Sequence, residues 1–437
     1  MSNKIQIVIN KFRNNYFNIL FFLIMPAFVM GQFIFKSILV IIIFSGILLL
    51  KTNIFKIQMN LINILFLFMM VFFSLNSLII SNYYYFFNER FFLYILIILL
   101  FLISVNLVKY NYLIIEKVFI SYVIIFLLIY ADTIYQFIYL KDLFGFSIYQ
   151  NYERFAGPFG DEFILGAFMS FFLLPSILFL IIEKKNTPLR KTCIFIFFIV
   201  SLYVALKSGE RIAFFTIILQ FILISFFLPY SKKIKYFFLP FITLCLFLIV
   251  IILDKGVAKK YNHFVTLLLN YNSEIIVNSQ KNVNSNKFGF LNTQTGAHFL
   301  TGIEIWKNHP IFGVGIKNFR HESSKEIYSN LKTHHVEYRV STHPHNYQIE
   351  ILSETGLIGF IIFNLFILTL LFKIYKIKSN NKKKKFAVYI LLIVPLSKYF
   401  PFKSDPSLFS SSLGLLFWIF IIFTLSCLNN LDEEVKE

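Results

Sequence analysis

The sequence predicts an all-helical integral membrane protein. Of its 437 residues, 58% are hydrophobic and only 14% are charged. Phe, Ile and Leu gather in runs of roughly 18 to 25 residues, the length that an α-helix needs to cross a bilayer. Residues 254–346 form a long polar interruption of this pattern. These observations predict many spanning helices and one large loop.

Hydropathy predicts about twelve transmembrane helices. The predicted ranges are 15–31, 33–50, 60–80, 91–108, 116–140, 163–182, 192–206, 212–229, 235–253, 351–375, 385–400 and 411–428. We therefore expect helices one to nine in residues 1–253 and helices ten to twelve, followed by a tail, in residues 347–437. Residues 254–346 are expected to form a loop with short amphipathic helices.

The net charge of +19 is explained by membrane topology rather than by nucleic-acid binding, because Lys and Arg occur in short bursts between apolar runs. The bursts, such as Lys184–Lys191 and Lys376–Lys385, fall in alternate loops on the side of the basic N-terminus. Cytoplasmic loops carry an excess of Lys and Arg. Both termini are thus predicted to be cytoplasmic, and residues 254–346 to lie on the outer face.

All eight histidines lie between His263 and His345, within this outer loop. Histidine exchanges protons near neutral pH, and a hydrocarbon span gains nothing from carrying one. His343 and His345 flank a proline just before an apolar helix, and Asn346 follows as an amide able to orient a ring. His345 is therefore a candidate general base, with an idle loop histidine as the alternative. No metal site is expected, because the histidines lack a helical i, i+4 pair and a nearby thiolate.

Two other outer patches place an arginine beside Gly or Pro at the edge of a span. Arg154 precedes the segment 155–161, and Arg211 follows the short turn 207–210. A guanidinium group is always charged, and its planar fork of donors fits a phosphate. The two arginines are a candidate diphosphate clamp. The alternative is that each pairs with a neighbouring carboxylate, such as Glu210, as an interfacial anchor.

Two pairs of polar residues lie one turn apart at the outer ends of predicted helices. Asp132 and Gln136 fall in helix five, and Glu350 and Glu354 fall at the start of helix ten. Such groups are costly in lipid, so each pair either lines a cavity or is satisfied by neighbouring elements. Gly356 predicts a kink or a late helix start.

The outer loop contains one segment with helical spacing of apolar residues. Between residues 295 and 308, Phe299, Ile303 and Trp306 recur at intervals that predict a short amphipathic helix on the membrane surface. The segment 309–315 ends it with a proline and two glycines. This composition predicts a turn whose backbone closely approaches another part of the molecule.

Together these patches resemble the O-antigen ligase and O-antigen polymerase superfamily. Its members are bacterial inner-membrane enzymes that transfer glycans from an undecaprenyl-diphosphate carrier on the periplasmic side. The resemblance extends from about Asp132 to Phe372, and its most specific segments are Trp306–Phe319, His343–Asn346 and Glu354–Gly359. It implies a GT-C-like membrane glycosyltransferase of lipopolysaccharide or other polysaccharide biosynthesis.

The resemblance implies that His345 is the general base on the acceptor hydroxyl and that Arg211 takes part in catalysis by binding the leaving diphosphate. His298 stands where family members often carry an arginine, which leaves a third phosphate contact to another residue. The residues expected to bind diphosphate or glycan are Arg154, Arg211, His343, Asn346, Arg339 and Arg320. No metal or other cofactor is implied, since arginines balance the pyrophosphate charge.

The expected reaction is a metal-independent transfer that inverts the sugar C1. The donor would be an undecaprenyl-diphosphate-linked glycan, and the acceptor a glycolipid (ligase), another carrier-linked chain (polymerase) or a protein hydroxyl. A transporter of lipid-linked glycan is the rival class, and it would predict charges in mid-helix and repeated halves. The scarce charges gather at the outer edge instead, which favours the enzyme. A non-catalytic membrane scaffold is a third alternative.

Overall fold

The computed structural model describes residues 15–80, 89–147, 155–160, 162–182, 187–227, 289–333, 335–377, 381–400 and 403–434, with a few isolated positions between 228 and 288. Within these residues the regular secondary structure is helical, apart from one isolated antiparallel bridge between Lys141 and Ser147. Eight of the described helices are long and apolar enough to cross a membrane. They are α3 (Gln32–Leu50, continued by η1, Lys51–Phe55), α4 (Leu61–Ile79), α5 (Arg90–Lys109), α6 (Ile115–Tyr139), α7 (Leu165–Ile182), α8 (Pro188–Lys207), α14 (Tyr347–Tyr375) and α16 (Ser412–Glu434). The predicted all-helical membrane fold is confirmed.

The predicted number of spans is confirmed only in part. Three further predicted helices are present but shorter: the apolar stretch Asn15–Met30, which ends in α2 (Ile24–Met30), α9 (Arg211–Phe227), and α15 (Lys382–Lys398). The predicted helix 235–253 lies outside the described residues, apart from isolated positions. The structure thus supports eight spans by length and composition, and the count of twelve stays a prediction.

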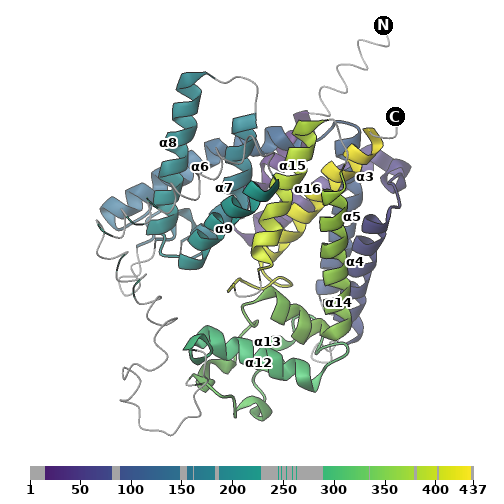
Figure 1. Ribbon diagram of the computed structural model, residues 1–437, viewed down its shortest axis with the longest axis vertical. Coiled ribbons are helices and arrows are strands. Elements are labelled where there is room, and N and C mark those ends of the chain that lie inside the picture. Colours follow the sequence, from purple (N-terminus) through teal and green to yellow (C-terminus); the bar gives the residue numbers. More distant parts are fainter. Residues whose placement is uncertain are drawn as a thin grey trace.

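The centre of the helical bundle is formed by α7 and α16. In their most apolar stretches, 78% of the residues of α7 and 94% of those of α16 are buried, against 33% in α3 and in α14. Figure 1 shows α15 and α16 in the middle of the bundle, with α4, α5 and α14 on one side and α6 to α9 on the other. Apolar residues left exposed on the outer helices match a surface that faces lipid.

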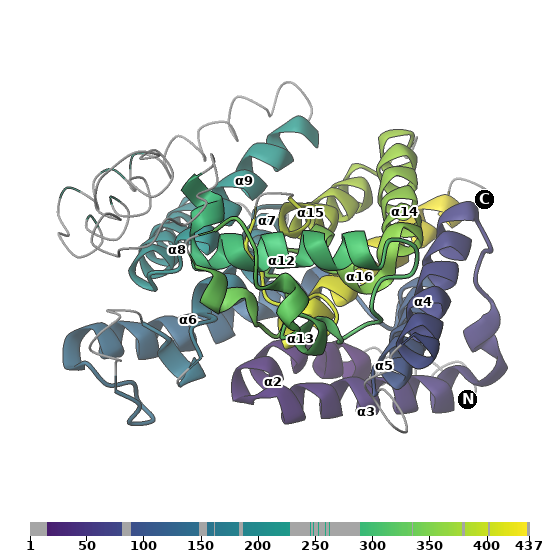
Figure 2. The ribbon, with the colours of Figure 1, turned by 90° about the horizontal axis from the view of Figure 1, so that it is seen from below.

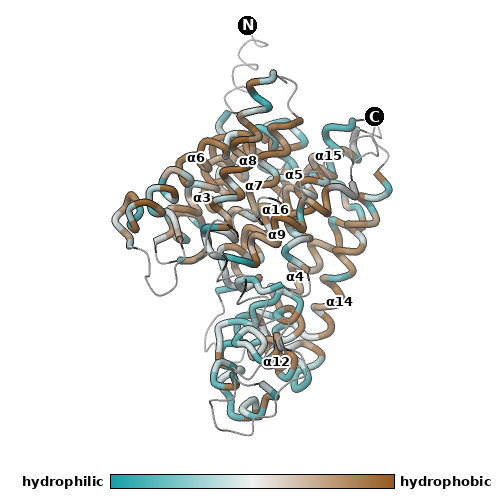
Figure 3. Tube along the Cα trace, turned by 60° about the vertical axis from the view of Figure 1, so that its left-hand side comes forward, coloured by the Kyte–Doolittle hydropathy of each residue, from teal (hydrophilic) through white to brown (hydrophobic). Residues whose placement is uncertain are grey.

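A polar unit covers one end of the bundle. It contains α12 (Gln294–Asn308) and α13 (Phe319–Glu322), which lie below the bundle in Figure 1 and cross its end in Figure 2. Figure 3 shows that this unit is largely hydrophilic, whereas the bundle is hydrophobic. The opposite end holds the last turns of α14 and α16, joined by an ion pair between Lys373 and Asp432 at 2.9 Å. The polar unit and the last turns of α14 and α16 therefore lie at opposite ends of the molecule.

The polar unit is joined to α14 at a kink. Gly356 has φ +65° and interrupts the helical backbone, as the sequence predicts. Opposite it, the N–H groups of Val314 and Gly315 donate to the carbonyls of residues 353 and 354 at 3.0 and 2.9 Å. A Cβ atom at Gly356 would lie 2.2 Å from the carbonyl oxygen of Ile311. The predicted close backbone approach of segment 309–315 is confirmed.

The two carboxylates at the start of α14 are satisfied by backbone N–H groups. Glu354 accepts from Lys317 at 2.9 Å and from Phe319 at 3.2 Å, which anchors the start of α13. Glu350 accepts from Leu408 at 2.7 Å, which anchors the loop between α15 and α16. Both side chains are only 1% exposed. They hold the polar unit and this loop on α14 rather than lining a cavity.

The polar pair in α6 has a similar structural role. Asp132 accepts a hydrogen bond from the N–H of Leu143 at 2.8 Å, and Gln136 accepts one from the N–H of Gly157 at 2.9 Å. Both bonds tie the segment after α6 back onto the helix. Of the two alternatives, satisfaction by neighbouring elements is the one that the structure shows.

Candidate functional site

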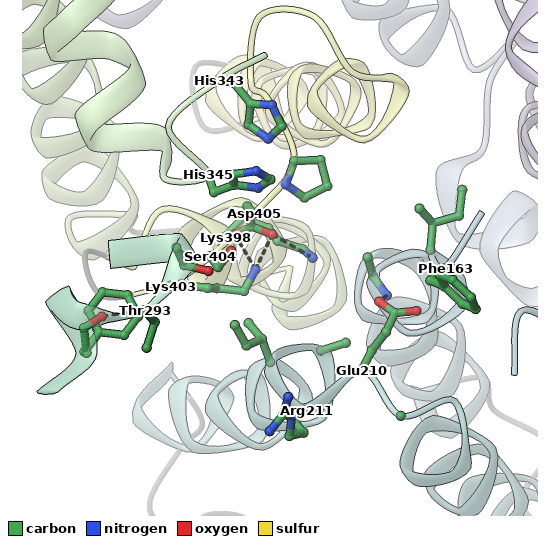
Figure 4. A pocket seen from close by; sticks show the side chains of 18 residues that line it. Phe163, Glu210, Arg211, Thr293, His343, His345, Lys398, Lys403, Ser404 and Asp405 are labelled. Atoms are coloured by element: carbon green, nitrogen blue, oxygen red, sulfur yellow. Dashed lines mark hydrogen bonds and ion pairs between the residues drawn. The ribbon is translucent and has the colours of Figure 1, made fainter. Parts of the chain in front are cut away.

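A cavity of about 550 Å³ lies between the bundle and the polar unit (Figure 4). Five segments line it: the start of α7, the turn between α8 and α9, the residues around the start of α12, the turn before α14, and the end of α15 with the loop that follows. Its polar lining consists of Glu210, Arg211, Thr293, Thr295, His343, His345, Lys398, Lys403, Ser404 and Asp405. The structure thus places His345, His343 and Arg211 around one cavity.

The turn that carries His345 is fixed by the loop between α15 and α16. His345 has φ +59°, a left-handed conformation that few non-glycine residues adopt, and its carbonyl accepts a hydrogen bond from the N–H of Asp405 at 2.8 Å. The side chain of Asn346 caps α14 by accepting from the N–H of Ile349 at 3.0 Å, and it donates to the carbonyl of Lys403 at 3.0 Å. Asn346 is therefore a buried positioning residue, outside the cavity lining.

Three histidine rings lie against one another at this turn. The ring centroids of His343 and His345 are 4.0 Å apart, and the ring of His298 stacks on that of His345 at 4.8 Å. Burial, together with the neighbouring imidazoles, lowers the pKa of His343 to about 3 and that of His345 to about 4. Both rings are consequently neutral at pH 7, the form in which a ring nitrogen accepts a proton.

His298 reaches His345 because α12 packs closely on the start of α14. Gly302 makes the approach possible, since a Cβ atom there would lie 2.3 Å from Cγ2 of Ile349. Burial lowers the pKa of His298 as well. His298, which stands where an arginine is expected, thus places a third aromatic ring beside His345.

Arg211 is placed at the cavity wall by a tight turn. Gly209 has φ +76°, so α8 ends and α9 begins within a few residues. The carboxylate of Glu210 accepts hydrogen bonds from the N–H groups of Gly166 at 2.7 Å and Ala167 at 3.0 Å, which satisfies the start of α7. In Figure 4 Arg211 lies on the opposite side of the cavity from the two histidines.

Sequence reasoning missed a cluster of charged residues on the cavity floor. Lys398, Lys403 and Asp405 line the cavity and are only 2%, 7% and 5% exposed. Lys403 forms an ion pair with Asp405, whose Oδ1 lies 3.7 Å from Nζ of Lys398. Nζ of Lys398 also donates to Oγ of Ser170 at 2.5 Å. One sequence signal could have pointed to this cluster. The alternation of charge between loops predicts that the loop between α15 and α16 lies on the same side as His345.

Of the other predicted arginine ligands, the two that the structure describes do not line the cavity. Arg320 lies in α13 and Arg339 in η6 (Val336–Arg339), and neither lines it. Arg154 falls outside the described residues. Within the part of the chain that the structure describes, no group of His, Cys, Asp and Glu is suited to hold a metal ion.

The fold and the cavity define a polytopic helical membrane protein with a polar site of histidine, arginine and lysine at one end of its bundle. Residues 195–364 match the family model described as O-Antigen ligase. Over these residues the chain is therefore similar to the O-antigen ligase domain family, which is associated with membrane glycan transfer of ligase or polymerase type. A comparison with curated proteins found no match. The matched segment includes Arg211, His298 and His345 and ends before Lys398.

Proposed function

We propose that the protein transfers a glycan from an undecaprenyl-diphosphate carrier to an acceptor hydroxyl at the outer face of a bacterial cytoplasmic membrane. The observation that carries the proposal is the shared cavity of His345 and Arg211, which come from distant parts of the matched segment. The charge pattern of the loops supports a periplasmic cavity with both termini in the cytoplasm. The lipid tail of the donor would lie among the helices.

The proposed reaction is a displacement at the sugar C1. Neutral His345 takes the proton of the acceptor hydroxyl while the hydroxyl oxygen attacks C1 from the face opposite the diphosphate. The bond between C1 and the phosphate oxygen breaks, its electron pair stays on the diphosphate, and C1 is inverted. A positioned base contributes about 10²–10⁴-fold in rate, and a charge-stabilising contact about 10²–10³-fold. Arg211 supplies such a contact.

The proposal is tested by reconstituting the full chain in lipid vesicles with an undecaprenyl-diphosphate-linked glycan. A glycolipid, a second carrier-linked glycan and an acceptor protein are then offered separately. We expect one acceptor to gain the glycan while undecaprenyl diphosphate is released in equal amount, and the productive acceptor distinguishes ligase from polymerase. If no undecaprenyl diphosphate were released with any of the three acceptors, the proposal would be overturned. A donor that is used only from the cytoplasmic side would contradict a periplasmic cavity.

Replacement of Arg211 by lysine is expected to lower kcat/KM by roughly 10- to 100-fold, because the charge is kept while the planar fork of donors is lost. The measurement is initial rate against donor concentration in the vesicle assay. Arg190→Lys is the matched control, since Arg190 lies at the start of α8 and donates to the carbonyl of Leu180 at 3.0 Å. Full activity of Arg211→Lys would exclude bidentate phosphate binding by this residue.

The low pKa of His345 predicts the pH dependence of transfer. A base with a pKa of about 4 stays unprotonated well below pH 6.5, so the acid limb of kcat/KM is expected below that value. His298 contributes to the lowering of this pKa, so His298→Ala should move the acid limb to higher pH. Rates measured from pH 4 to 8 check both statements. An acid limb that is unchanged in His298→Ala would mean that the stacked ring does not tune His345.

A further inference from the structure

The cavity holds more positive than negative side chains. Its lining includes the cations Arg211, Lys398 and Lys403 and the carboxylates of Glu210 and Asp405, and both nearby histidines are neutral. Both oxygens of the Glu210 carboxylate already accept backbone N–H groups of α7. Of these cations, Lys398 and Lys403 are buried, with the one buried carboxylate of Asp405 beside them. Burial and the nearby Lys403 lower the pKa of Lys398 to about 7, so holding both lysines charged is costly unless an anion offsets it. The cavity is therefore built to receive a negatively charged group.

The two lysines share one carboxylate. The ammonium group of Lys403 contacts both oxygens of Asp405, and that of Lys398 lies 3.7 Å from Oδ1 of the same residue. The lysine side chains repel one another electrostatically. Asp405 therefore holds two like charges close together at the cavity floor. If Lys403 moved to bind another anion, the carboxylate of Asp405 would still lie beside Lys398.

The position of this cluster fits the leaving group of the proposed reaction. In Figure 4 the cluster lies between the two histidines and Arg211. When the bond from C1 to the phosphate oxygen breaks, the diphosphate gains one negative charge, and this charge forms away from the base. A lysine ammonium is a compact charge with three donors, suited to phosphate oxygens.

We infer that Lys403 is a second diphosphate ligand, on the cavity floor, in addition to Arg211. Lys403 leaves Asp405 to bind the phosphate nearer the sugar, and Lys398 remains as the partner of Asp405. This inference rests on the proposed function. It adds a diphosphate ligand from the loop between α15 and α16, which lies outside the segment that matches the family model. Lys403 thereby touches the group that departs in the reaction.

The test compares binding of inorganic pyrophosphate to the full chain and to three variants by isothermal titration. Lys403→Met should weaken binding by about 10-fold, since one charge-assisted contact is lost. Asp405→Asn should bind as tightly as the unmodified chain or more tightly, because the competing carboxylate is gone. Lys307→Met is the control, since Lys307 is exposed on α12 and pairs with Glu304 at 2.7 Å.

The opposite responses of the two cavity variants separate phosphate binding from a purely structural ion pair. Breaking a structural pair would weaken binding and lower the Tm in Lys403→Met and Asp405→Asn alike, and that result would overturn the inference. Pyrophosphate binding that is unchanged in Lys403→Met would also overturn it while leaving the proposed function intact. A full chain that binds neither pyrophosphate nor the lipid-linked donor would overturn both.

Discussion

Replacement of His345 by alanine is expected to lower the rate of glycan transfer by about 10²–10⁴-fold, the usual contribution of a positioned base. The loss should fall on kcat, whereas binding of the lipid-linked donor should change little, because the cations of the cavity remain. Single-turnover rates and donor affinity, measured separately on the same preparation, distinguish the chemical step from binding. The removed imidazole leaves space beside His343 and His298, but the backbone partner of the turn is unaffected.

The matched control is His335→Ala. His335 belongs to the same polar unit, but its ring lies outside the cavity and pairs with Glu337 at 3.2 Å. Its replacement should leave the transfer rate within about two-fold, the usual effect of a surface change. If His345→Ala turned over at the unmodified rate, another group would have to accept the proton, and His343 would be the nearest imidazole in the cavity.

Replacement of Gly356 by alanine is expected to destabilise the protein by about 3 kcal/mol or more. A positive φ costs a non-glycine residue about 1–3 kcal/mol. In addition, the new Cβ would lie 2.2 Å from the carbonyl oxygen of Ile311 and 2.6 Å from the backbone nitrogen of Gly313, so backbone would have to move. The expected result is a lower Tm and the loss of transfer activity, because the kink seats the polar unit over the cavity.

Gly145→Ala separates the two causes. Gly145 also has a positive φ, +93°, but nothing lies within 4 Å of its added Cβ. Only the backbone cost of about 1–2 kcal/mol should then appear. The Tm of both variants is measured by thermal unfolding in the same detergent. If the Tm fell equally in both, the contact between segment 309–315 and α14 would add nothing to stability.

Much of the fold could be predicted because it depends on local patterns. Apolar runs of membrane length predict the helices, Gly356 predicts the kink, and helical spacing predicts α12. The alternation of charge between loops also places Arg211 and His345 on the same side. A cavity shared by these two residues is consistent with this pattern, because both are predicted to lie at the same ends of their spans.

The parts that could not be predicted depend on contacts between distant segments. Whether Glu350 and Glu354 line a cavity is decided by N–H groups from residues 317–319 and 408, which the sequence does not place beside them. Lys403 and Asp405 do not stand out in the sequence, because they meet the cavity only when their loop folds against the turn of His345. Their charges are visible in the sequence, but their proximity to His345 is not.

The hydrogen bond from Asp405 to the carbonyl of His345 has a consequence for protein engineering. The turn that carries His345 is completed by a loop that follows residue 364, where the family match ends. A chimera that received only residues 195–364 from a relative would combine that relative's histidine and arginine with the host's own loop between α15 and α16. Exchange of specificity between relatives would therefore require the last helical hairpin to be transplanted together with the domain.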